Sequence, residues 1–376
     1  MAEPDGVGAA HAPVRASIVD VAARAGVSVA TVSRALRELP NVSSTTRARV
    51  LKAAAELEYT ASPLASGLVT GRVRSVGVVM PYAGRWFFAE VLRGIEEALR
   101  DRGYDLVLHV LADTERRQGF FASMPVRRRV DAVLIVALPL EQHEVDVLRS
   151  LKIPLAAVAE PVAGVHGEYI DNTRAARIAV QHLVNLGHRR IACIGGDMAG
   201  PERFSDPGMR SRGYREACAE AGITELPEWE QDGRFTAQGG ERAMSVLLAQ
   251  PGGRPTAVFC QSDEMAFGAM HALRRSGLRC PEDVSVIGLD DHDLAETFDM
   301  TTIAQPVIEQ GAAAARWVVG LLDRVVPAGA VEDEELAASG FEGLDMPGAV
   351  PMPGPLEGHV HPVRLVLRGS TGPAPA

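Results

Sequence analysis

The sequence predicts an α/β protein built from a small all-α helix-turn-helix module and a larger, doubly wound region that forms two lobes. Three short amphipathic helical patterns cover residues 17–59, with a tight glycine turn between the first two. From residue 75 onward β-like runs alternate with helical ones, which is typical of parallel sheets covered by helices on both faces. Residues 75–376 are too many for one such unit, so we expect two lobes and a ligand cleft outside the carboxyl ends of the strands.

Each helix of the N-terminal module has a start signal. Ser17 is expected to cap the first helix, Ser28 the second, and Ser43 or Ser44 the third, while Gly26 ends the first helix. Apolar residues that recur at a spacing of three to four can close one small core: Val21, Ala22, Ala25, Val27, Val32, Leu36, Val50, Ala54 and Leu57. This is a helix-turn-helix pattern, which places one helix in the major groove of duplex DNA.

The charge of the chain is unevenly distributed. Residues 15–74 contain nine Lys and Arg against four Asp and Glu, whereas the whole chain has a formal net charge of −10. The remainder therefore carries about −15, and only the N-terminal module is electrostatically suited to DNA phosphates.

Residues 26–34 read GVSVATVSR, and this run resembles the headpiece of the lactose-repressor and galactose-repressor family of bacterial transcription regulators. The family pattern is GVS, two variable residues and TVSR. The resemblance implies that two sets of side chains meet DNA, with bases read by Val29, Ala30 and Arg34, and phosphates contacted by Ser28, Thr31 and Ser33. Val29 and Ala30 offer only apolar contacts, for example to a thymine methyl, whereas the planar fork of Arg34 suits guanine. The alternative for Arg34 is an ordinary solvated helix charge.

Residues 60–74 fall where the family has a hinge helix that folds on DNA. By position, the resemblance makes Leu68 the side chain wedged into the minor groove and Ala65 the small residue where two hinges cross. Gly67 lies inside this segment and weakens a helix by about 1 kcal/mol relative to Ala. The alternative is a plain flexible linker.

The β-like runs of the larger region are SVGVVM, YDLVLHV, AVLIVAL, PLAAVA, RIACIGG, AVFC and VSVIGLD. Clear helical patterns cover residues 89–102, 175–186 and 264–276. Further motifs stand in family order: Asp171-Asn172 after Ile170, GHRRI at 187–191, Arg210 before Gly213-Tyr214, SDEMA at 262–266, PEDVSVIG at 281–288, and Asp290-Asp291.

These motifs imply a two-lobe effector domain like the periplasmic sugar-binding proteins, with three crossings between lobes. By resemblance the first lobe takes about 75–170 and 304–330, and the second about 171–303 and 331–376. The family's effector contacts fall by position on five residues: Trp86, Phe87, Arg210, Phe235 and Asp290. A carboxylate and a guanidinium can grip vicinal hydroxyls while an aromatic face covers a ring, so we expect a small polar effector, a sugar. Trp86 and Phe87 could instead belong to the core.

Other chemistries are not expected. Adjacent side chains at residues 290–293 point in different directions, which argues against a metal site. No cofactor motif, catalytic nucleophile or acid/base pair has the required spacing, so an enzyme is not predicted. The four cysteines, Cys193, Cys218, Cys260 and Cys280, show no CxxC pairing, which suits a reducing cytosol.

Two segments have compositions typical of disorder. Residues 1–16 are rich in Ala, Gly and Pro and lack the features of a secretion signal or membrane anchor. Residues 327–362 contain seven acidic residues and no Lys or Arg, and we expect a disordered acidic insert there.

We therefore expect a cytoplasmic, nucleoid-associated regulator that binds double-stranded operator DNA and a small-molecule effector as a homodimer, with a tetramer left open and no membrane partner. The alternative is a stand-alone solute-binding or sugar-binding protein without a DNA role.

Overall fold

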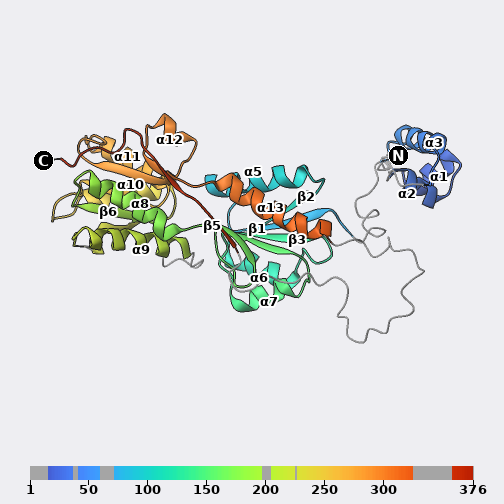
Figure 1. Cartoon of the computed structure of the whole chain (residues 1–376), viewed down its shortest axis with the longest axis horizontal. Coiled ribbons are helices and arrows are strands. Elements are labelled where there is room, and N and C mark those ends of the chain that lie inside the picture. Colours follow the sequence, from blue (N-terminus) through green and yellow to red (C-terminus); the bar gives the residue numbers. More distant parts are fainter. Residues whose placement is uncertain are drawn as a thin grey trace, which may run out of the picture. The chain divides into compact units, whose positions relative to one another are not determined.

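The chain divides into two compact units, residues 1–73 and 74–376, which are described separately here (Figure 1). The structure is a computed structural model, and it describes residues 16–36, 41–59, 72–196, 205–224, 227–324 and 358–375. Among these residues, no helix is both long and apolar enough to cross a bilayer.

The N-terminal unit consists of three helices, α1 (Ile18–Ala25), α2 (Val29–Leu36) and α3 (Ser44–Glu56). Ser17 and Asp20 form a reciprocal capping box at the start of α1, and Gly26 ends this helix in the left-handed conformation with φ of 62°. Ser43 caps α3 through the backbone N–H of Thr46. The three helices close one core of small apolar side chains: Val21, Ala22, Ala25, Val32, Ala35, Val50, Ala53 and Ala54.

The second unit contains two lobes, each with one six-stranded sheet. The elements of the first lobe are β1 (Ser75–Met80), α5 (Trp86–Arg100), β2 (Asp105–Val110), α6 (Thr114–Ser123), β3 (Ala132–Val136), α7 (Gln142–Arg149), β4 (Leu155–Val158), β5 (His166–Ile170), α13 (Val307–Arg324) and β11 (Gly358–His361). Its strand order is β11-β5-β4-β3-β1-β2, and all pairings are parallel.

The second lobe repeats this winding with strand order β12-β10-β9-β8-β6-β7. Its elements are α8 (Asn172–Asn185), β6 (Ile191–Gly195), α9 (Ser205–Glu220), η1 (Pro227–Trp229), β7 (Glu230–Asp232), α10 (Ala237–Leu248), β8 (Ala257–Cys260), α11 (Asp263–Arg275), β9 (Ser285–Asp290), α12 (Leu294–Thr297), β10 (Thr302–Ala304) and β12 (Arg364–Val366). Only the terminal pair, β10 with β12, is antiparallel. The doubly wound fold class predicted from the sequence is confirmed.

Helices cover both faces of each sheet (Figure 1). In the first lobe, α5 and α13 close one core against the sheet, and α6 and α7 close another on the opposite face. In the second lobe, α8 and α9 cover one face and α10 and α11 the other. A parallel sheet buried on both faces needs continuous apolar strands, and the buried runs β1, β3 and β9 meet that need.

The C-terminal stretch corrects one sequence prediction. Residues 331–376 were expected in the second lobe, with residues 327–362 as an acidic insert. Instead, residues 358–361 form β11, which pairs with β5 in the first lobe. The imidazole of His361 is buried and hydrogen-bonded to Glu168 at 2.8 Å. A strand this short, with two histidines and only one large apolar residue, has no apolar alternation that would reveal it.

Helices α5 and α13 approach each other closely at two glycines. A Cβ placed on Gly94 would lie 2.0 Å from the carbonyl oxygen of Ile308, and one on Gly311 would lie 2.3 Å from that of Val91. Both neighbours are backbone atoms and cannot rotate away. These glycines therefore set the distance between the two helices that cover one face of the first sheet.

Replacing either glycine with alanine should force the helices apart. We expect Gly311→Ala to lower the free energy of unfolding by about 1–3 kcal/mol in urea titrations, because overpacking shifts backbone. Gly320→Ala on the same helix is the matched control, since no atom lies within 4 Å of its added Cβ. The control should be neutral or stabilising by up to about 1 kcal/mol. Equal stability of the two variants would contradict close packing at Gly311.

Candidate functional site

The outer face of α2 carries the residues that the sequence assigned to DNA bases. Val29 is 41% exposed, and Ala30 and Arg34 are also exposed, whereas Val32 and Ala35 are buried against α1 and α3. Within the described residues, the Arg34 guanidinium has no hydrogen-bond or ion-pair partner. One helix face is therefore available to a ligand, because its opposite face supplies the core.

Hydroxyl groups gather at the start of the same helix. Ser28 Oγ accepts the backbone N–H of Thr31 at 3.2 Å, and the two hydroxyls are 2.9 Å apart. Ser28 is exposed, and Thr31 and Ser33 are half-buried. Hydroxyls and N–H groups at a helix N-terminus suit phosphate oxygens. The other two predicted DNA contacts, Ala65 and Leu68, lie outside the described residues.

A pocket lies between the two lobes of the second unit. It is lined by side chains that follow the carboxyl ends of strands or begin the next helices: Tyr82, Arg85, Phe87, Phe88 and Ala137 from the first lobe, and Asp206, Arg210, Phe235, Ser262, Glu264 and Asp290 from the second. The winding of parallel sheets brings these ends together. Four of the five sequence-predicted effector residues, Phe87, Arg210, Phe235 and Asp290, lie in this lining.

Arg210 on α9 is 5% exposed and is held from three directions. Its Nε donates to Asn172 Oδ1 at 2.7 Å and its Nη1 donates to the carbonyl oxygen of Gln261 at 2.5 Å. Nη2 lies 3.9 Å from the carboxylate of Asp206. These partners leave part of the guanidinium's five-donor fork for the pocket, in a fixed orientation.

Asp290 ends β9 and is 6% exposed. Its Oδ1 accepts a hydrogen bond from Gln305 Nε2 at 2.7 Å. Its φ of 141° and the φ of 60° at Asp291 are unusual for residues other than glycine, and such backbone strain concentrates at functional sites. Burial raises the pKa of the Asp290 carboxyl, while Arg210 and the Gln305 hydrogen bond oppose that rise.

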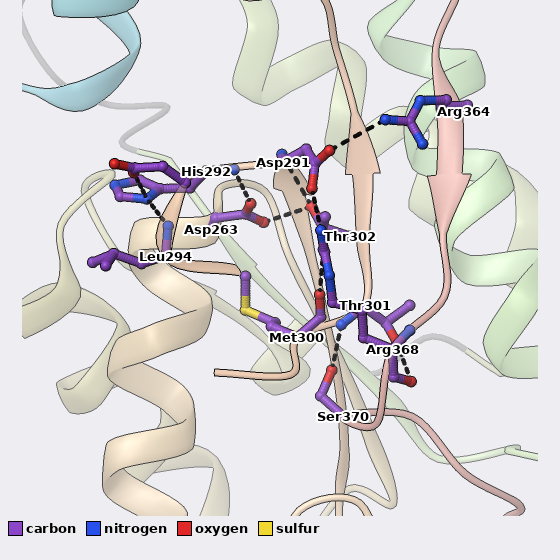
Figure 2. Close-up of polar contacts among 11 residues, drawn as sticks. Asp263, Asp291, His292, Leu294, Met300, Thr301, Thr302, Arg364, Arg368 and Ser370 are labelled. Carbon is purple, nitrogen blue, oxygen red and sulfur yellow. Dashed lines mark hydrogen bonds and ion pairs between the residues drawn. The ribbon is translucent and has the colours of Figure 1, made fainter. Parts of the chain in front are cut away.

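The loop after β9 is held by carboxylates (Figure 2). Asp263 accepts the backbone N–H of His292 at 2.8 Å and the hydroxyl of Thr302 at 2.6 Å. Asp291 forms ion pairs with Arg368 at 2.8 Å and Arg364 at 3.4 Å. The acidic residues of this loop therefore point to separate protein partners, and no group of three metal-binding side chains forms in the described parts of the chain.

The aromatic residues of the pocket occupy different surroundings. The ring of Phe235 packs on Gly196, where a Cβ would lie 2.0 Å from the ring. Phe87 lines the pocket and also packs at the edge of the first-lobe core. Trp86 lies outside this lining but lines a neighbouring cavity together with Asp290 and Gln305, and its ring stacks on His292, with 4.6 Å between ring centroids. The predicted role of Trp86 in direct effector contact stays a prediction.

Seven residues of the pocket lining are not predicted from the sequence: Tyr82, Arg85, Phe88, Ala137, Asp206, Ser262 and Glu264. They share one signal, a position just after a strand or in the first turns of the helix that follows it. Ser262, for example, caps α11 through the N–H of Met265 at 3.4 Å. This position alone does not identify pocket residues, because every strand of a doubly wound sheet is followed by residues of this kind.

Glu160 joins the lobes beside the pocket. It follows β4 in the first lobe, is buried, and accepts the backbone N–H of Ser205 at the start of α9 at 3.1 Å. Burial raises the pKa of Glu160 to about 7, and the nearby carboxylate of Asp206 adds to the rise. The buried carboxyl of Glu160 is therefore mainly protonated below about pH 7.

Comparisons with known proteins agree with both parts of the fold. Residues 17–62 match the description "Bacterial regulatory proteins, lacI family", and residues 180–337 match a periplasmic binding protein-like domain. The HTH-type transcriptional repressor CytR of Escherichia coli (strain K12) is 38% identical over 300 residues, which span 79% of this chain and 86% of CytR.

Two solved structures extend the comparison. The transcriptional regulator CelR in complex with cellobiose is 30% identical, has a TM-score of 0.65, and aligns over 95% of this chain and all of its own. The lac repressor dimer bound to operator and the anti-inducer ONPF has a TM-score of 0.78 over 96% of this chain and all of its own. At 24% identity, this similarity shows a shared fold only.

The buried Glu160 should make stability depend on pH. Because its pKa in the folded protein exceeds the ordinary value of 4.5, its contribution is complete below pH 4.5 and is lost as pH rises through about 7. We expect Glu160→Gln to gain about 1–3 kcal/mol relative to wild type between pH 5 and pH 8.5, measured by urea unfolding at each pH. Exposed Glu97, changed to Gln, is the control. Parallel pH curves for wild type and Glu160→Gln would contradict the burial of this carboxyl.

Proposed function

The chain belongs to the lacI family of bacterial regulatory proteins, and from this premise we propose that it binds a pseudo-palindromic operator as a homodimer and responds to a sugar held between its lobes. Regulators of this family bind DNA through the helix-turn-helix domain and are controlled by small-molecule effectors. The relatives support this function over a stand-alone solute-binding protein. They are regulators and not enzymes, and we infer the same for this chain.

The proposed contacts with DNA bases lie on the exposed face of α2. Val29, Ala30 and Arg34 stand on the face opposite the core, where a major groove would meet them. Arg34 is the one long polar side chain of the three, so it is assigned to a guanine. One such domain makes few contacts, and two copies in a dimer supply the affinity that specific binding needs.

The pocket carries the proposal for a sugar. Arg210 and Asp290 present a fixed guanidinium and a carboxylate, which can bind adjacent hydroxyl groups. Phe87 and Phe235 provide flat apolar surfaces for the carbon face of a ring. The complex of CelR with cellobiose supports the same ligand class.

The proposed regulation couples the pocket to DNA. A ligand can alter DNA affinity only if it binds two arrangements of the lobes unequally. We assign residues 60–74 as the hinge, with Leu68 as a minor-groove wedge and Ala65 at the crossing of two hinges. Because the proposed partner is chromosomal DNA, the working location is the cytoplasm, at the nucleoid.

Arg34→Ala should reduce specific DNA binding by about 1–3 kcal/mol and relax preference at one base pair per half-site, because a bidentate contact to guanine is lost. Operator sequences from the chain's own upstream region, compared with random DNA, give the measurement by gel shift. Arg24→Ala is the control, since its guanidinium is already paired with Glu56 at 2.7 Å. An equal loss on operator and random DNA would show that Arg34 contacts only phosphate.

Asp290→Asn should raise the sugar concentration needed for a response by more than about tenfold, because a hydrogen bond to a charged acceptor is lost. Operator affinity without sugar should stay within twofold of wild type. The titration uses a sugar panel that begins with cellobiose. Asp293→Asn, three residues along in the same loop with a largely exposed side chain, is the control. If Asp290→Asn responded to sugar at the wild-type concentration, Asp290 would not be part of the effector site.

A further inference from the structure

Two glutamines connect the Asp290 carboxylate to the first lobe. Gln305 follows β10 at the second crossing between the lobes, and its Nε2 donates to Asp290 Oδ1 at 2.7 Å. Gln310 lies in the first turns of α13 and is 1% exposed, and its Nε2 donates to Gln305 Oε1 at 3.2 Å. All three side chains are buried, so each hydrogen bond replaces one that water could otherwise supply.

The orientation of the Gln305 amide decides whether a hydrogen-bond donor or an acceptor faces Asp290. The oxygen and nitrogen ends of an amide are nearly equal in shape, so packing alone does not choose between them. With Nε2 toward Asp290 the amide stabilises the carboxylate, whereas with Oε1 in that place it repels the charge. The Asp290 carboxylate accepts only from the Nε2 end, and Gln310, by donating to Oε1, favours the same orientation of the amide.

Gln310 is also well placed to keep a fixed position. Its helix packs on α5 through Gly94 and Gly311, where backbone touches backbone. The first turn of α5 provides Phe87 and Phe88 to the pocket. The helix pair that orients Gln305 therefore also positions part of the aromatic wall.

We propose that Gln310 is a positioning residue for the effector pocket: by fixing the amide of Gln305, it keeps a hydrogen-bond donor on Asp290 and aligns this carboxylate with the first lobe. The proposal rests on the proposed role of Asp290 in effector binding. It gives Gln310, which lines neither this pocket nor the neighbouring cavity that shares Asp290, an indirect part in ligand recognition.

The charged neighbours of Asp290 explain why one donor matters. Burial raises the pKa of Asp290 most strongly and Glu264 on α11 adds to the rise, whereas Arg210 on α9 opposes it. Burial also raises the pKa of Asp263 on α11, and the nearby charge of Asp290 adds to that rise. Burial outweighs the contacts that favour the charged form, so losing the Gln305 donor should raise the pKa of Asp290 further.

The test reads the titration of Asp290 directly in the full chain. Carbon-13 NMR of protein labelled at aspartate carboxyl groups follows each signal with pH, and the Asp290 signal is the one missing from Asp290→Asn. The variants are Gln305→Met, Gln310→Met and the double variant, because methionine keeps the volume without the amide. Gln181→Met, at a surface glutamine bonded only to Asn185, is the control.

We expect Gln310→Met and Gln305→Met each to raise the Asp290 midpoint by about one pH unit. The double variant should match Gln305→Met alone, because Gln310 acts only through Gln305. The control should titrate and bind operator like wild type. If Gln310→Met folds poorly, Gln310→Asn keeps the buried amide but shortens its reach, and the same rise is expected.

An unchanged midpoint in both folded Gln310 variants, with a raised one in Gln305→Met, would overturn the proposal. So would a further rise in the double variant, since Gln310 would then act by another route. This readout needs no effector. A protein that responds to no sugar but shows the expected midpoints would contradict the proposed ligand class and leave the positioning role of Gln310 intact.

Discussion

The interlobe pocket depends on one buried positive charge, the guanidinium of Arg210. A guanidinium removed from water is tolerated only when its donors are matched by acceptors. Asn172, Gln261 and Asp206 supply them from the starts or ends of three different elements. The packing of the second lobe is therefore tied to this side chain, which cannot move without leaving several acceptors unpaired.

The acidic groups of the pocket are also buried, and burial changes their pKa values. Burial raises the pKa of the carboxyl groups of Asp290, Asp206 and Glu264. Arg210 opposes the rise at Asp290 and Asp206, and Arg85 opposes it at Glu264. A ligand that brings hydroxyl groups between Arg210 and Asp290 meets a set of polar atoms already in place.

The sequence predicted the fold from local signals and the pocket from a family resemblance. Ser17, Gly26 and Ser43 mark their helices as expected, and the seven β-like runs became β1, β2, β3, β4, β6, β8 and β9. Short edge strands such as β11 were not predicted, because pairing with a neighbouring strand, and not apolar alternation, defines them.

The roles of Glu160 and Gln310 could not be predicted from the sequence for a related reason. Their roles come from contacts with Ser205 and Gln305 across the lobes, and no local pattern encodes those contacts.

The short stretch from residue 358 to residue 366 adds the last strand to both sheets, β11 beside β5 and β12 beside β10. Edge strands left uncovered present unpaired N–H and C=O groups and favour association with other chains. One segment thus protects two sheets at once. A chain that lacked residues 358–366 would expose the edges of β5 and β10 together, and two open sheet edges favour association with other chains.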